Sequence, residues 1–276
     1  MSGLVLSVFS GAGMLDYGFR REGWCVVSAG DLVSGVDIRD CHFPAGVFLG
    51  VIGGDPCQSH SALANLVRAK GLEPSFPDMT PDFRRVIDEV QPEWFLRENV
   101  PKAPPLEPDG YDVRSFLLCN SHLDSGDGTG NEQMRKRRFW FGTRNRVCPE
   151  LRAHIDFALF ELPTVTHSVK GNDRNDIHFM RHKRQAVAAD SRAVPVRHGG
   201  SGKVKVTAVG APGVDYSPPR RSLGDMLELQ GFPRGWMDYQ PWTMAAKRKM
   251  VGNGVSLPMS RALARAIRLV LMERAA

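Results

Sequence analysis

Short apolar runs alternate with helix-like segments through the first half of the chain. Runs rich in β-branched and aromatic residues predict buried strands at residues 4–9, 23–30, 45–54 and 93–99. Between them, residues 15–23 and 81–92 carry apolar positions at helical spacing, and glycine or proline closes each segment. A later strand is expected at 135–144, flanked by charge. This alternation predicts an α/β fold with a doubly wound parallel sheet and sites at the carboxyl ends of the strands.

This alternation of strand-like and helix-like segments stops between about residues 145 and 219. The stretch holds five of the eight histidines and a glycine-rich tract, and its periodicity is weak. Alternation at 203–209 predicts a short exposed strand. We interpret the stretch as a small, separate, loop-rich lobe, with a long disordered insertion as the alternative. Helical patterns at 220–233 and 260–275 then return the chain to the first domain.

Composition narrows the class of protein. The chain has 276 residues, a net charge of +6 and a pI near 9.2, which favours an anionic partner without identifying one. Its five cysteines form no CxxC pair and are odd in number, which argues against a disulfide framework or a zinc site. The first apolar run is too short for a signal peptide or a membrane span. We therefore expect a cytoplasmic protein with reduced cysteines and no bound metal.

A glycine turn, FSGAG, follows the first expected strand. Such a turn lets a ligand approach the backbone and places the amino end of the next helix beneath it. It is not the dinucleotide GxGxxG motif, because Met14 follows Gly13 and no glycine lies three residues further on. Asp31, at the end of the second strand, and the later Asp37 could each bind the paired hydroxyls of a ribose, the alternative being a solvated loop position. The order of turn and acids favours an adenosine cofactor.

A cysteine follows the third expected strand, in the stretch VIGGDPCQSHS. Cys57 should emerge at a carboxyl strand end in a turn that Pro56 stiffens, although an isolated cysteine is more often a buried packing residue. Glu98 ends the next apolar run, so the two side chains are expected at one crevice. A thiol nucleophile beside a carboxyl acid–base group would form a reaction centre.

Six segments occur in a diagnostic order: VFSGAG, GGDPCQSHS, RENVP, EQMRKRRFWFG, LELQGFP and VGNGVSLP. Over roughly residues 7–271 this order resembles the DNA (cytosine-5)-methyltransferase family, which uses S-adenosylmethionine. The resemblance implies a Rossmann-like methyltransferase sheet in a catalytic domain at 1–144 and 220–276, with a target recognition domain at 145–219. It also implies methyl transfer to C5 of a flipped-out cytosine in a short duplex DNA sequence, through a covalent Cys57–C6 intermediate.

The resemblance also suggests roles for individual residues. Cys57 matches the nucleophile and Glu98 the catalytic glutamate, while Arg135 and Arg137 match arginines that hold the cytosine and stabilise the nucleophile's loop. Asn99 matches a loop-ordering residue. With the two acids above, the expected cofactor contacts are Phe9, Ser10, Gly11, Ala12, Gly13, Asp31, Asp37, Ile38, Pro56, Met79, Asn253 and Val255.

Double-stranded DNA is the expected partner of a monomer that needs no protein partner and no membrane. The expected DNA contacts are Gln58, Ser61, Arg181, Lys183 and Arg184. For the last three, a solvated basic face is an equal alternative. Three departures from the family pattern stand near the site: Met14, Asp55 and His60. We expect His60 to face a DNA phosphate, and we expect an active enzyme because no catalytic group is missing.

Two other functions stay open. An RNA cytosine methyltransferase could use the same scaffold, although the Cys-Phe-Thr signature of that branch is not found here. A catalytically silent DNA-binding factor is the other alternative, and the intact Cys57, Glu98, Arg135 and Arg137 argue against it. The biological role is equally open among restriction protection, orphan regulation and phage self-modification.

Overall fold

The computed structural model describes most of the chain. The described residues are 3–60, 71, 77–124, 133, 135–157, 193–197, 204–208 and 222–273.

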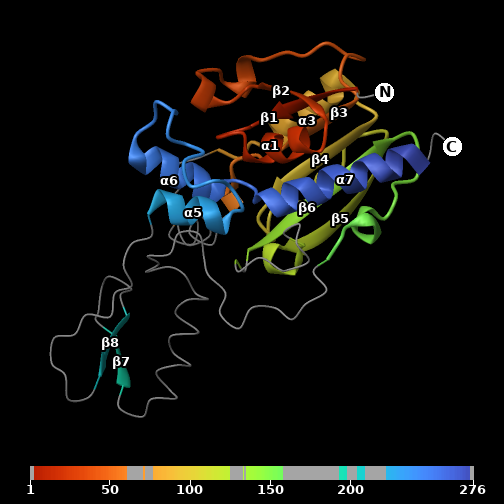
Figure 1. Cartoon of the computed structure of the whole chain (residues 1–276). Helices are drawn as coiled ribbons and strands as arrows, with labels where there is room; N and C mark the ends of the chain where they lie inside the picture. The colour runs from red at the N-terminus through yellow and green to blue at the C-terminus, as the bar shows by residue number, and fades with distance from the viewer. Residues whose placement is uncertain are drawn as a thin grey trace.

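A six-stranded sheet forms the centre of the molecule (Figure 1). Its spatial order is β2–β1–β3–β4–β6–β5, with bounds Cys25–Ala29, Leu4–Val8, Gly50–Gly53, Trp94–Asn99, Lys136–Arg144 and Tyr111–Cys119. The first four strands are parallel, and β6 and β5 each pair antiparallel. The α/β class and the five expected strands are confirmed. The sheet is mixed rather than wholly parallel, and β5 was not predicted.

Helices cover both faces of the sheet. Helices α1 (Met14–Arg21) and α7 (Leu257–Glu273) pack together on one face, where they bury Phe19 and Leu263 (Figure 1). Helix α3 (Thr80–Val90) packs on the other face through Phe83. Successive strand residues point to opposite faces, so Val5 of β1 joins the first layer and Leu6 the second. The doubly wound arrangement is therefore confirmed.

The connections that build the site contain 3-10 turns. Between β2 and β3 the chain makes only two 3-10 turns, η1 (Leu32–Ser34) and η2 (Ile38–Asp40). After β3, the turn η3 (Cys57–His60) begins the next connection. Two further 3-10 turns, η4 (Asn120–His122) and η5 (Leu151–His154), follow β5 and β6. The reduced β2–β3 crossover leaves the carboxyl end of the sheet open beside β1.

Two C-terminal helices close this edge of the sheet. Helix α5 (Leu223–Leu229) begins with a capping box between Ser222 and Asp225, which satisfies amides that a helix start leaves unpaired. Helix α6 (Met244–Asn253), which was not predicted, begins at Thr243, whose side chain accepts from the backbone. Both helices share a buried cluster with Met14 at the start of α1. The C-terminal segment is thereby held against the first glycine turn.

The expected second lobe is described only in part. Strands β7 (Ala193–Arg197) and β8 (Val204–Ala208) form an antiparallel pair, and β8 confirms the strand expected at 203–209. Three residues past position 145 are buried in the layer that α1 and α7 cover: Cys148, Leu151 and Ile155. The packed core thus extends beyond the expected boundary at residue 145, and the division into two domains stays a prediction.

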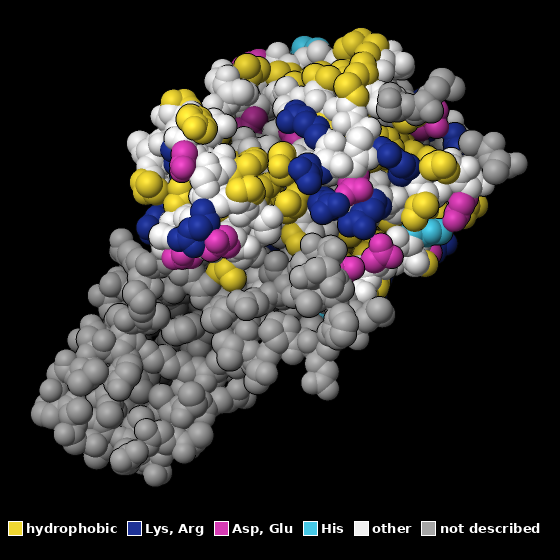
Figure 2. Space-filling view, in the orientation of Figure 1, with side chains coloured by type: hydrophobic (Ala, Val, Ile, Leu, Met, Phe, Trp, Pro, Cys, Tyr) yellow, Lys and Arg dark blue, Asp and Glu magenta, His cyan; other side chains and the backbone are white. Residues whose placement is uncertain are grey.

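Basic side chains gather over the region of α1 and α7 on the face drawn in Figure 2. Arg261 and Arg265 of α7 pair with Glu22, just after α1, and Arg268 stacks over Trp24. These cations therefore help to join α7 to α1. Within the part of the chain that the structure describes, no helix combines the length and apolar character that crossing a bilayer requires.

Candidate active site

A cavity of about 500 Å³ opens at the carboxyl ends of the parallel strands, where doubly wound folds place their ligands. The turns after β1, β2, β3 and β4 line it, and α6 closes one side. Most predicted cofactor contacts line this cavity: Phe9, Ser10, Gly11, Ala12, Asp31, Asp37, Ile38, Pro56, Met79, Asn253 and Val255. Gly13 lies just behind the lining and begins α1. The sequence motifs therefore converge on one space.

The glycine turn after β1 adopts left-handed backbone angles. Phe9, Gly11 and Gly13 have φ values of 53°, 54° and 72°. That conformation suits glycine but strains phenylalanine, whose ring stacks on Phe83 with centroids 6.2 Å apart. The amide of Gly11 donates to Asp31 Oδ2 at 2.7 Å. The turn is thus fixed beside the cavity by the side chain of Asp31, which follows β2 and begins η1.

The two acids expected to bind a ribose both reach the cavity. Asp31 accepts from Gly11 and, through Oδ1, from the amide of Val33 at 2.8 Å, which leaves further lone pairs on both oxygens. Asp37 forms an ion pair with Arg39. Hydrogen bonds from the side chain and backbone of Arg39 lower the pKa of Asp37 to about 2. Both acids are placed as expected, and their role toward a ribose stays a prediction.

The turn η3 carries Cys57 to the cavity wall, directly after β3 and next to Pro56. All five cysteines are described, and none is in a disulfide. Close approach explains the two preceding glycines. A Cβ at Gly53 would lie 2.3 Å from the carbonyl oxygen of Val8, and one at Gly54 would lie 2.8 Å from Glu98 Oε2. The glycines allow the turn that carries Cys57 to pass against β1 and Glu98.

Glu98 lies at the end of β4 and also lines the cavity. Its Oε1 is 2.7 Å from Nε of Arg137, which comes from the antiparallel neighbour β6. Burial raises the pKa of Glu98 above its ordinary value, although the charges of Arg137 and Arg135 act in the opposite direction. The structure therefore brings Cys57, Glu98 and Arg137 to one wall.

Arg135 occupies a different position from Arg137. Its guanidinium donates to the carbonyl oxygens of Gly252, Asn253 and Gly254 at 2.8–3.0 Å. Burial and the nearby Arg137 charge lower the pKa of Arg135 to about 9, whereas negative charge on Glu98 and on Cys57 raises it. Arg135 thus stays cationic at neutral pH, holds the C-terminal turn of the cavity, and lies close enough to interact electrostatically with both predicted catalytic groups.

Met14, one of the departures from the family pattern, has a packing role. It is 2% exposed, and a Cβ at Gly254 would lie 2.2 Å from its sulfur atom. A second glycine at position 14 would lose this contact, whereas methionine joins the first turn to the C-terminal turn. Methionine in place of glycine at position 14 therefore packs this part of the cavity wall more closely.

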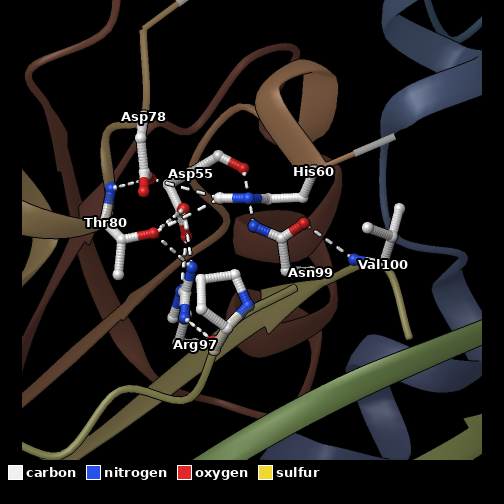
Figure 3. Close-up of polar contacts among 8 residues, drawn as sticks. Asp55, His60, Asp78, Thr80, Arg97, Asn99 and Val100 are labelled. Carbon is white, nitrogen blue, oxygen red and sulfur yellow. Dashed lines mark hydrogen bonds and ion pairs between the residues drawn. The ribbon is translucent and has the colours of Figure 1, made fainter. Parts of the chain in front are cut away.

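The expectation that His60 faces a DNA phosphate is wrong. Its side chain is only 10% exposed and is directed inward, with Nε2 3.2 Å from Asp78 Oδ1 and 3.4 Å from Thr80 Oγ1 (Figure 3). The carboxylate of Asp55, the other departure, is buried against the guanidinium of Arg97. These positions belong to one polar network, which is fully buried at Asp55 and Arg97 and reaches solvent at Asp78.

Several residues at the site were not predicted. Asp16 is buried beneath the glycine turn, where the hydroxyls of Ser7 and Ser28 donate to it, and burial raises its pKa. Arg97 is fully buried next to Glu98. Arg97 offered a signal, because a charged residue in a segment expected to form a buried strand needs a buried partner.

The predicted DNA contacts are mostly beyond the described part of the chain. Gln58 lines the cavity beside Cys57. Ser61, Arg181, Lys183 and Arg184 lie outside the described residues. Asn99 donates to the carbonyl oxygen of Asp55 and accepts from the amide of Val100, which agrees with its predicted part in ordering this loop.

Comparisons with known proteins agree with this site. A family model described as C-5 cytosine-specific DNA methylase matches residues 32–105, the segment that holds Cys57 and Glu98. The chain is 23% identical to the type II methyltransferase M.HgiDI of Herpetosiphon aurantiacus over 97% of this chain and 95% of that protein. It is 33% identical to the type II methyltransferase M.NgoPII of Neisseria gonorrhoeae over 51% of this chain and 48% of that protein.

Solved structures support the fold. The Entamoeba histolytica methyltransferase EhMeth superposes with a TM-score of 0.56 at 13% identity, covering 98% of this chain and 99% of that one. At such identity the likeness shows a shared fold alone. The matching family model and the relatives, together with the motif residues gathered around one cavity, agree with the resemblance of this chain to the DNA (cytosine-5)-methyltransferase family.

Proposed function

We propose that this protein transfers the methyl group of S-adenosylmethionine to C5 of a flipped-out cytosine in duplex DNA. One observation carries the proposal. Cys57, Glu98 and Arg137 line the same cavity as the glycine turn and Asp31. A nucleophile, an acid and a cofactor-type turn thus share one cavity, as a group-transfer reaction requires.

The cavity suits S-adenosylmethionine in size and chemistry. Its volume of about 500 Å³ lies within the roughly 300–1,000 Å³ typical of small-molecule sites. Gly11 brings bare backbone to the cavity, and Asp31 keeps acceptor capacity for ribose hydroxyls. Asn253 and Val255 would close the cofactor site from the C-terminal segment. When bound, the cofactor supplies a methyl group activated by a sulfonium centre.

Cys57 supplies the nucleophile in the proposed mechanism. The C5 atom of cytosine is too weakly nucleophilic to accept a methyl group directly, so the thiolate adds to C6 and converts the ring to an enamine. A cysteine reacts as its thiolate, and nearby positive charge favours that form. Arg135 interacts electrostatically with Cys57 and supplies such charge. Once C5 carries the methyl group, its proton is lost to solvent and the C6–S bond breaks, which returns the Cys57 thiolate and gives 5-methylcytosine.

Glu98 would recognise and polarise the base. The raised pKa of Glu98 keeps its carboxyl protonated to higher pH than an ordinary glutamate, so that it can donate a hydrogen bond to N3 of cytosine. The second oxygen can accept from the exocyclic amine. Arg137, paired to the same carboxyl at 2.7 Å, orients it. Together these contacts stabilise the charge that develops on the ring after thiolate addition.

The target base must leave the duplex to reach Cys57, because C5 and C6 lie within the base stack. Flipping costs roughly a few kcal/mol, which protein contacts to phosphates and groove edges must offset. We assign these contacts to the segment 145–219, including Arg181, Lys183 and Arg184, and propose that the enzyme acts as a monomer.

Genome-wide methylation mapping tests the proposal. Wild-type protein, Cys57→Ala and the control Cys25→Ala, which alters an exposed cysteine of β2, are expressed in a bacterial host without cytosine methylation. Bisulfite sequencing should show protected cytosines in one short motif for the wild type and the control, and none for Cys57→Ala. No protection with wild-type protein would contradict DNA methylation, and a transfer assay on tRNA would then test the RNA alternative. Cofactor binding without transfer to either would favour a silent DNA-binding factor.

A further inference from the structure

A single polar network joins the two ends of the connection between β3 and α3. His60 closes η3 at the beginning of this connection, and Asp78 and Thr80 stand at its end, where α3 starts. His60 Nε2 lies 3.2 Å from Asp78 Oδ1 and 3.4 Å from Thr80 Oγ1 (Figure 3). Asp78 Oδ1 also accepts from the amide of Thr80 at 2.9 Å. Side chains far apart in sequence thus hold both ends together.

Arg97 anchors this network to the strand that carries Glu98. Its Nε and Nη2 donate to the two carboxylate oxygens of Asp55 at 2.5 and 2.8 Å, and both side chains are fully buried. The same Nη2 donates to Thr80 Oγ1 at 2.8 Å, and Nη1 donates to the carbonyl oxygen of Pro104 at 2.8 Å. Thr80 in turn donates to Asp55 Oδ2 at 3.2 Å. The residue directly before Glu98 therefore fixes the turn that precedes Cys57.

The same atoms could be taken for a metal site. Ligand atoms of Asp55, His60 and Asp78 lie within 4.8 Å of one another. The guanidinium of Arg97 already supplies positive charge to Asp55 and Thr80 at hydrogen-bond distance, so a divalent cation bound there would face strong like-charge repulsion. The arrangement is a mechanical link between segments rather than a cation site.

We propose that Asp55, His60, Asp78, Thr80 and Arg97 act as a clamp that positions the thiol of Cys57 relative to Glu98. These are positioning residues, and the proposal rests on the proposed function of Cys57 and Glu98. Cys57 lies between Asp55 and His60, so the clamp holds its turn on both sides. Pro77 and Met79, on either side of Asp78, line the cavity, so the clamp also defines that part of its wall.

Two variants release the clamp without removing its buried ion pair. Thr80→Val keeps the shape of the side chain but deletes the hydroxyl that joins Arg97, Asp55 and His60. His60→Ala removes the link to Asp78. Cys57 alkylation by iodoacetamide, followed by peptide mass spectrometry, reports the accessibility of the thiol without needing any methylation activity. Methyl transfer to a duplex carrying the mapped target motif is measured in the same preparations under single-turnover conditions.

A clamp predicts opposite changes in the two measurements. Both variants should alkylate Cys57 about threefold faster or more, because the thiol is less confined. Both should transfer methyl groups about tenfold more slowly or worse, because the nucleophile is less well placed. Thr80→Ser, which restores a hydroxyl, should return both rates toward the wild type. Loss of a residue that merely supports the fold would raise the alkylation of the buried cysteines Cys119 and Cys148 together with that of Cys57.

The other cysteines serve as internal controls for unfolding. Exposed Cys25 should alkylate at one rate in every variant, and buried Cys119 and Cys148 should stay protected. The matched control Asp88→Asn alters a half-exposed acid of α3 that pairs with Arg84, remote from the cavity wall, and should change neither rate.

Unchanged Cys57 alkylation in Thr80→Val and His60→Ala would overturn the clamp, whatever the wild-type activity. Faster alkylation without slower transfer in an active enzyme would also overturn it. A wild-type protein that transfers no methyl group would instead contradict the proposed function, and the alkylation rates would still decide whether the network confines Cys57.

Discussion

Replacing Arg97 alone should destabilise the protein more than replacing Arg97 and Asp55 together. Both side chains are 0% exposed and form a two-point ion pair. Among the described residues, Arg97→Met leaves the buried carboxylate of Asp55 with the Thr80 hydroxyl as its one remaining side-chain donor. An uncompensated buried charge of this kind costs about 3–5 kcal/mol, whereas exchanging both partners for apolar residues of similar volume is often close to neutral.

The structure also indicates how much of the lost free energy of unfolding the double variant should regain. Asp55→Leu/Arg97→Met removes both charges, and the hydrogen bond from Asn99 survives because it reaches the backbone carbonyl of Asp55. The carbonyl oxygen of Pro104 and the hydroxyl of Thr80 still lose their Arg97 donor. We therefore expect a residual loss of about 1–2 kcal/mol in the double variant, from these two weakened groups.

Thermal and urea unfolding measure the difference. At about 2–4 °C per kcal/mol for a chain of this size, the single variant should melt roughly 6–20 °C below the wild type. The double variant should melt only a few degrees below it. Arg114→Met, which breaks an exposed pair with Glu150, should cost less than about 1 kcal/mol. Equal stability of the single and double variants would refute the reasoning. The double variant should stay catalytically impaired, because stability returns without the clamp.

Two further predictions concern the cavity. The pKa of Glu98 is raised above the ordinary glutamate range, so activity that needs its protonated carboxyl should fall as pH rises through that pKa. This fall forms an alkaline limb in the pH dependence of kcat/KM, and Glu98→Gln should abolish it. Retention of the limb in the variant would assign it to another group. Arg135 reaches the three carbonyls of residues 252–254 from two nitrogens of a planar fork, whereas Arg135→Lys places all its donors on one nitrogen. The Kd of this variant for S-adenosylmethionine, measured by calorimetry, should therefore rise about tenfold, the equivalent of one hydrogen bond. Arg114→Lys should leave this Kd unchanged, and an unchanged value for Arg135→Lys would show that the turn needs no such support.

Much of the fold could be predicted from the local sequence pattern. Strand β5 and helix α6 were not predicted, and each omission has a physical cause. Strand β5 alternates charged and apolar residues because it lies at the sheet edge with one side in solvent, so Asp112 and Arg114 interrupt its apolar run. Helix α6 is polar around much of its surface, so its periodicity is faint. Its start at Thr243 was nevertheless readable as a capping residue followed by good helix formers.

The site was predictable where a motif places a residue at a strand end, and less so where side chains meet across the fold. Cys57, Glu98 and Asp31 reach the cavity because parallel strands bring their carboxyl ends to one edge. The inward turn of His60 depends on Asp78 and Thr80, which approach it only when α3 packs on the sheet. Sequence spacing carries no information about that approach.

The register between β3 and β4 connects the fold of the sheet to the placement of the site residues. Strands β3 and β4 pair so that Gly53 lies opposite Arg97, which sets Gly54 against Glu98 one residue later. The same register brings Asp55 within reach of the Arg97 guanidinium, because the chain bends away from the sheet just beyond β3. A one-residue slip would turn Arg97 toward the opposite face and separate the charges. The buried ion pair therefore stabilises the one register in which Cys57 and Glu98 share a cavity, and the placement of the reactive groups depends on the pairing of the strands beneath them.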